Sequence, residues 1–376
     1  MEITQRKERN SAVELLRIIS MIMIVFHHFA NHGGFVYEPT DITVPHFWYN
    51  LILIGGKVGV NVFIFISGYY LIEDKGPLFN TKRILKFWGQ LFFYSVTLFW
   101  VTHFLGYADI LGGVTFFVQI FCPVTFSVWW FASNYFVLYV LHPFINVLLR
   151  GLNKKTYQML IAVAVVFWCV IPTIADVDFG SNSLLWFITL YAVAGYIKLF
   201  GLNEKFKCGH YAIMCISLFA LTYLISTASV LLGRKWPFFT SYVTYFFSEQ
   251  KITVSLISLS LFMTFITMKM KYHKWINVIA SATFGVYLIH DNKYFSSFLW
   301  EVLLKNAQYQ NSLFVIPYSI IVVTVVFVSC ICIDLLRQLL LGKPFAALVD
   351  KYSYIIEKPF KKAAEFFKNI VMGKDD

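Results

Sequence analysis

Ten long apolar runs dominate this chain and limit what it can fold into. They cover residues 12–29, 50–72, 84–105, 129–149, 159–174, 184–200, 211–232, 252–268, 276–298 and 313–336. A helix needs about 20 mainly apolar residues to cross the hydrocarbon core of a bilayer. A helix also satisfies its own backbone hydrogen bonds in lipid, where water cannot. The sequence therefore predicts an all-α protein, a polytopic bundle of about ten transmembrane helices.

The composition excludes an ordinary soluble enzyme and a nucleic-acid-binding protein. Only 14% of the residues are charged and 59% are hydrophobic, whereas soluble domains carry about 25% charged residues. The net charge of +11 is not accompanied by an aromatic-and-basic nucleic-acid motif. The six cysteines include no C-x-x-C pair, so they indicate neither a disulfide framework nor a metal site.

Lys and Arg residues are unevenly divided between the two sets of connections. With the N-terminus inside, the cytoplasmic stretches hold 24 of the 31 Lys and Arg residues, including Arg6, Lys7 and Arg9. The connections on the other side hold 5. Short cytoplasmic loops carry such an excess, so we expect both termini to be cytoplasmic.

The C-terminal segment differs in pattern from the rest of the chain. Apolar and basic side chains alternate along it, as in helices that lie on an anionic lipid surface. We therefore predict a transmembrane domain over residues 1–344 and a basic amphipathic cytoplasmic tail over 345–376, with membrane lipids as a partner.

Two ionisable residues of the first run are candidate catalytic residues. Arg17 and His28 are eleven positions apart, which places them within about 20° of the same helix face. His27 points about 100° away. Charged residues in membrane spans are costly and are functional by default, although Arg17 alone could simply reach back to the inner surface.

A second histidine could perform the same chemistry. His290 lies in the outer third of the ninth run, at the end of the segment Phe284-Gly285-Val286-Tyr287-Leu288-Ile289-His290. A neutral imidazole near pH 7 can take the proton from a hydroxyl group. Spacing alone does not decide whether His28 or His290 is the base.

Polar and aromatic residues near the expected outer ends are candidates for contact with a substrate. Lys57 and Asn61 lie in the glycine-rich part of the second run, and Trp129 and Trp130 open the fourth. A double tryptophan is also typical of the belt at a membrane surface, so both interpretations stay open.

In the order of its motifs the chain resembles the membrane acyltransferase-3 family of O-acyltransferases. The first run matches the family's arginine, ten residues, histidine signature with Arg17 and His28, and Phe63–Gly68 is similar to its phenylalanine-rich Ser-Gly motif. The segment Phe284–His290 resembles its ninth-helix motif, and Trp129–Pro143 resembles its fourth helix. Stand-alone relatives from Gram-positive bacteria look most similar.

The resemblance implies an activity and a donor. It implies transfer of an acetyl group from cytoplasmic acetyl-CoA to a hydroxyl of an outward-facing or lipid-linked polysaccharide, in the bacterial cytoplasmic membrane and without a metal. Arg17, Ser67, Arg83 and Lys86 would bind the donor. The family's Arg-x-x-Arg reads Arg83-Ile84-Leu85-Lys86 here, and lysine loses the bidentate fork of arginine.

A second class of function fits the same composition. A polytopic transporter or flippase for a glycan would also need many apolar spans, and such proteins commonly contain two related halves. No internal repeat is visible in this sequence, which favours the acyltransferase.

Overall fold

The computed structural model describes residues 10–107, 118–177, 182–201 and 205–371, so Arg6, Lys7 and Arg9 lie outside the described residues. These residues form helices and no strand, which confirms the all-α prediction. The α-helices are α1 (Ser11–His32), α2 (Val44–Leu71), α3 (Thr81–Phe104), α5 (Trp130–Gly151), α6 (Lys154–Val165), α7 (Ile171–Ala175), α8 (Ser183–Phe200), α9 (Cys208–Gly233), α10 (Ile252–Thr267), α11 (Lys274–His290) and α12 (Val315–Val371).

Within these ranges, nine helical stretches are long and apolar enough to cross a membrane. They match nine of the ten apolar runs. The remaining run, the ninth (276–298), overlaps α11, which has 17 residues and ends at His290. The helix stops early because the Asn292 side chain accepts the backbone N–H groups of Tyr294 and Phe295, and asparagine favours such local turns over a continued helix.

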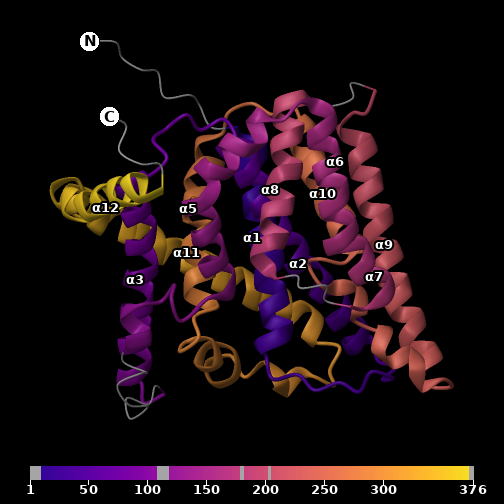
Figure 1. Cartoon of the computed structure of the whole chain (residues 1–376). Helices are drawn as coiled ribbons and strands as arrows, with labels where there is room; N and C mark the ends of the chain where they lie inside the picture. Colours follow the sequence, from indigo (N-terminus) through magenta and orange to yellow (C-terminus); the bar gives the residue numbers. More distant parts are fainter. Residues whose placement is uncertain (1–9, 108–117, 178–181, 202–204, 372–376) are drawn as a thin grey trace.

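Helices α1 and α2 run through the middle of the bundle, with α3 at one edge and α9 at the other (Figure 1). A glycine stripe on α2 lets them approach closely. A Cβ atom at Gly56 would lie 2.2 Å from the His27 ring, and one at Gly59 would lie 2.6 Å from the Ser20 carbonyl oxygen. Small residues allow this kind of close helix contact in membranes, so the glycines of the second run serve packing.

A buried carboxylate joins α3, α11 and α12. The Asp334 side chain has no solvent exposure. It accepts one hydrogen bond from the Tyr94 hydroxyl at 2.7 Å and another from Arg337 Nε at 2.8 Å. A Cβ atom at Gly285 would lie 2.2 Å from Asp334 Cγ. The glycine of the Phe284–His290 segment therefore provides the space for this ion pair.

The start of α1 and the C-terminal part of α12 lie at the same end of the bundle (Figure 1). That part of α12 packs on α3, where Phe345 fills the space over Gly89 and Asp350 pairs with Lys82 at 3.0 Å. Which end faces the cytoplasm stays a prediction, as does the division between residues 344 and 345.

Candidate active site

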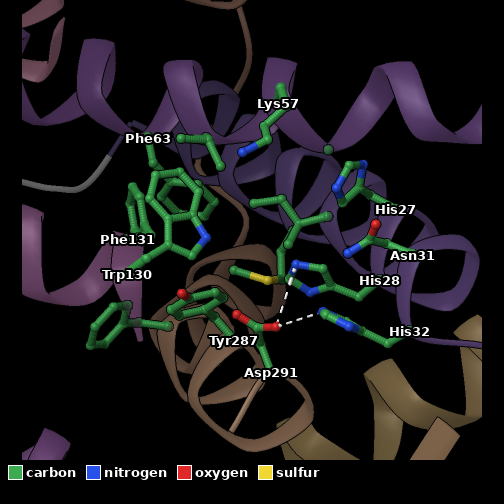
Figure 2. A pocket seen from close by; sticks show the side chains of 15 residues that line it. His27, His28, Asn31, His32, Lys57, Phe63, Trp130, Phe131, Tyr287 and Asp291 are labelled. Carbon is green, nitrogen blue, oxygen red and sulfur yellow. Dashed lines mark ion pairs between the residues drawn. The ribbon is translucent and has the colours of Figure 1, made fainter. Parts of the chain in front are cut away.

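A cavity of about 400 Å³ lies among α1, α2, α5 and α11, near the C-terminal end of α1. Its side chains converge on one space, as Figure 2 shows. The lining residues come from the segments that the sequence singles out, and they include His27, His28, Asn31, His32, Lys57, Phe63, Trp130, Phe131, Phe284, Tyr287 and Asp291.

The two candidate base residues meet at this cavity. His28 Nδ1 lies 2.8 Å from His290 Nε2, and His290 Nδ1 lies 2.6 Å from the Val286 carbonyl oxygen one turn back along α11. A carbonyl oxygen only accepts, so His290 carries its proton on Nδ1 and its Nε2 accepts the proton of His28 Nδ1. These two hydrogen bonds leave the lone pair of His28 Nε2 free.

An acidic side chain faces that lone pair. Asp291 Oδ1 lies 3.5 Å from His28 Nε2 and 3.2 Å from His32 Nε2, and the three side chains point toward one another (Figure 2). His28 and His32 share a face of α1 because they are four residues apart. Sequence reasoning missed Asp291 and His32, although Asp291 directly follows the signature histidine and the i, i+4 spacing was visible.

Two of the four candidate substrate-binding residues line the cavity. Lys57 Nζ lies 4.3 Å from the centre of the Trp130 ring and 3.1 Å from Glu249 Oε2. The ion pair and the ring fix the position of the ammonium group. Glu249 was also missed, because it precedes α10 in a loop and no local pattern marks it.

Asn61 and Trp129 are buried beside the cavity and do not line it. The Asn61 amide donates to the Glu249 carbonyl oxygen at 2.8 Å and accepts from the Trp186 indole at 3.2 Å. Asn61 therefore holds the loop that carries Glu249. Trp129 is the N-cap residue of α5.

The four candidate donor-binding residues lie outside the lining of this cavity. Arg17 is partly exposed, with Nε 3.9 Å from Glu14 Oε2. The Ser67 hydroxyl bonds the Phe63 carbonyl oxygen and the Tyr135 hydroxyl. The structure thus places Arg17 and His28 on one helix without joining them in one cavity.

Arg83 and Lys86 line different surfaces of α3. Arg83 donates to Asp74 at 2.5 Å, whereas Lys86 lines a second cavity, of about 490 Å³, together with Arg337 of α12. Burial alone would raise the pKa of Asp74, but the Gly76 N–H and the Arg83 guanidinium outweigh it and hold this pKa below its usual value. Asp74 therefore stays ionised and keeps its hold on Arg83.

Packed aromatic rings lie between the small pocket that contains Arg83 and the main cavity. The Phe87 ring lies 5.4 Å from that of Phe284, which lines the cavity. On its other side it lies 5.6 Å from the ring of Tyr139, which lines a small pocket with Arg83. Phe87 therefore contacts the lining of both regions.

Two comparisons with known proteins gave nothing: no curated protein and no solved structure matches the chain. A comparison with family models matches residues 10–334 to the acyltransferase domain of the acyltransferase-3 type. The match contains every residue of the His28–His290–Asp291 cluster. The nine apolar spans and this match together establish that the chain belongs to the acyltransferase-3 family and is a multi-pass membrane acyltransferase.

Proposed function

We propose that the protein transfers an acetyl group from acetyl-CoA, bound from the cytoplasm, to a hydroxyl of an extracytoplasmic or lipid-linked polysaccharide in a bacterial cytoplasmic membrane. The observation that carries the proposal is the free lone pair of His28 Nε2, set by the hydrogen bonds from His28 to His290 and on to Val286. A base oriented by a second group in this way is the arrangement that activates hydroxyl nucleophiles.

In the proposed reaction, His28 Nε2 takes the proton of the acceptor hydroxyl as its oxygen attacks the thioester carbon. The new C–O bond forms, the C–S bond breaks, and the proton passes from His28 to the sulfur of CoA. Asp291, 3.5 Å away, stabilises the imidazolium between these two events. His290 is a positioning residue, because its interaction with the reacting groups runs through His28.

The other walls of the cavity suit a carbohydrate acceptor. The Trp130 ring and the neighbouring Phe63 and Phe131 rings offer flat apolar faces to a sugar ring. Lys57 and Asn31 offer hydrogen-bond donors to its hydroxyl groups. A few polar groups in a largely apolar cavity are typical of a small-molecule site.

The donor would bind at the end of the bundle where α1 starts. Arg17, Ser67, Arg83 and Lys86 gather in the half of the bundle near that end, and arginine and lysine side chains bind phosphate oxygens strongly. The acetyl end of the donor would then pass the Phe87 and Phe284 rings to reach His28.

Replacing Arg17 with alanine should raise the KM for acetyl-CoA about tenfold and change kcat little. The reason is that one charge-assisted hydrogen bond contributes about 1.5–3 kcal/mol. Steady-state kinetics in detergent micelles measures both constants. Arg234→Ala, an exposed arginine after α9, is the matched control. An unchanged KM in Arg17→Ala would leave this arginine without a role in donor binding.

Replacing Asp291 with asparagine should lower kcat by about 10–100-fold, because the imidazolium formed on His28 then lacks its anion. The KM for acetyl-CoA should stay within about twofold, since Asp291 lies in the acceptor cavity. A change in KM with constant kcat would contradict the assigned role.

The function itself is tested by adding purified protein to radiolabelled acetyl-CoA and glycans from the source cell. Release of CoA together with label in the glycan is the expected result. In cells, NMR spectra of the surface glycan with and without the gene should differ in O-acetyl signals. Identical spectra, or transport of glycan without CoA release, would contradict the proposal and favour a flippase.

A further inference from the structure

We infer that His28, His32 and Asp291 form a binding site for a divalent transition-metal ion, Zn²⁺ above all, and that an ion bound there blocks the base. The three side chains each offer one ligand atom, and these atoms lie within 4.8 Å of one another. Two of the three come from one face of α1, and the third follows α11 directly.

The ligand chemistry fits zinc. Two imidazole nitrogens and one carboxylate oxygen are ligands that Zn²⁺ takes in proteins, often with a fourth position left open. Ligand atoms around a tetrahedral zinc ion lie about 3.3 Å apart. The separations from Asp291 Oδ1, 3.5 Å to His28 Nε2 and 3.2 Å to His32 Nε2, are already near this value.

The hydrogen bonds behind His28 prepare it as a ligand. A histidine binds a metal through an unprotonated nitrogen while its other N–H donates to a fixed acceptor. His28 Nδ1 donates to His290 Nε2, and His290 is itself held by the Val286 carbonyl oxygen. Nε2, which faces Asp291, is therefore the nitrogen that is free to bind an ion.

An ion has a route to this site. The His32 side chain is 34% exposed, and it stands in the last turn of α1, at the rim of the cavity of about 400 Å³. The fourth ligand position would open toward that cavity, where water or a hydroxyl group of an acceptor could occupy it.

A zinc ion bound at this site should also affect catalysis, and this part of the inference rests on the proposed function. The lone pair that binds the ion is the one that would take the acceptor proton, so the ion and the proton compete for His28 Nε2. Zinc should therefore inhibit acetyl transfer. Binding of the ion does not depend on which reaction the protein catalyses.

Binding is tested with the full-length protein in detergent micelles, after treatment with EDTA and gel filtration, by competing for Zn²⁺ with a chromophoric chelator. We expect one ion per chain. A metal site loses about 10–100-fold in affinity when a ligand loses only its hydrogen-bond partner. His32→Gln removes a ligand itself, so it should weaken zinc binding by more than that.

The matched control is His27→Gln. His27 also lines the cavity and is adjacent to His28, but its Nδ1 lies 2.8 Å from the Leu53 carbonyl oxygen and it is not one of the three ligands. Zinc binding should be unchanged in this variant. Equal binding by the wild type and His32→Gln, or no binding at one equivalent, would overturn the inference.

Cobalt gives a readout that does not depend on activity or on one variant. Co²⁺ in a tetrahedral site with two histidines and a carboxylate should show visible absorption bands, and these should be lost in Asp291→Asn as well as in His32→Gln. Elution volumes that match the wild type would establish that both variants are folded. Persistence of the bands in both folded variants would place the ion elsewhere.

Zinc inhibition of acetyl transfer distinguishes a failure of the zinc site from a failure of the proposed function. Zinc should inhibit acetyl transfer by the wild type, and the zinc concentration needed to inhibit His32→Gln should be higher by the same factor as its loss of zinc affinity. Stoichiometric binding without inhibition would support the site and contradict the assignment of His28 as the base. Inhibition without binding at these residues would contradict the site and leave the base assignment intact.

Discussion

His28→Ala should lower the rate of acetyl transfer by about 10²–10⁴-fold, the usual contribution of a positioned general base, while the protein remains folded in the membrane. The loss follows from the geometry, because His28 lines the cavity, its Nε2 faces Asp291 and its Nδ1 is held by His290. Initial rates with saturating acetyl-CoA and acceptor give the measurement. The yield of protein in the membrane fraction gives the check on folding.

A histidine of the same kind at a different place serves as the control. His210 is exposed at the start of α9, and His210→Ala should keep the full rate. Added imidazole should restore part of the activity of His28→Ala, since the vacated side-chain volume adjoins the cavity. A purely structural role for His28 would give no such rescue, and a full rate in His28→Ala would disprove its role as the base.

Gly285→Ala should strongly destabilise the fold. The added Cβ would lie 2.2 Å from Asp334 Cγ and 2.5 Å from Asp334 Cβ, so a change of rotamer cannot relieve the contact. Overpacking costs about 1–3 kcal/mol, and breaking the buried Asp334–Arg337 pair costs about 3–5 kcal/mol. Separation of α11 from α12 would also displace His290.

The measurement is the temperature at which the detergent-solubilised protein loses its monodisperse gel-filtration peak. Gly342→Ala is the control, because it lies inside α12 and no atom lies within 4 Å of the Cβ position there. It should melt at the wild-type temperature or slightly above, since alanine favours a helix by about 1 kcal/mol over glycine. Equal melting temperatures for both variants would mean that α11 and α12 can move apart at Gly285 without loss of stability.

The helices were predictable because each apolar run carries its own signal of length and hydropathy. The run 276–298 is the exception, because the predicted span continues past His290 across the polar residues Asp291, Asn292 and Lys293. The helix ends at His290, where the Asn292 side chain accepts hydrogen bonds from the backbone N–H groups of Tyr294 and Phe295. The extension of α2 back to Val44 was missed for a similar reason, since Thr43 caps His46 N–H in a polar stretch.

The candidate site was predictable only where residues belong to ordered motifs. His28 and His290 could be named from their own segments, but their 2.8 Å contact depends on how α1 packs on α11. Asp291, His32 and Glu249 were missed, since their roles come from side chains that meet across helices. The family model supports the acyltransferase chemistry as a whole, and the geometry is what separates cavity residues such as Lys57 from buried neighbours such as Asn61.

The packing of Phe87 against Phe284 and Tyr139 affects how the proposed enzyme treats water. A thioester that stands beside an activated base hydrolyses unless water is kept away or the acyl group arrives last. On the proposed path of the donor, rings that stay packed until an acceptor is bound would keep acetyl-CoA away from His28 and limit its hydrolysis. Small side chains at Phe87 would then turn a selective transferase into a leaky thioesterase.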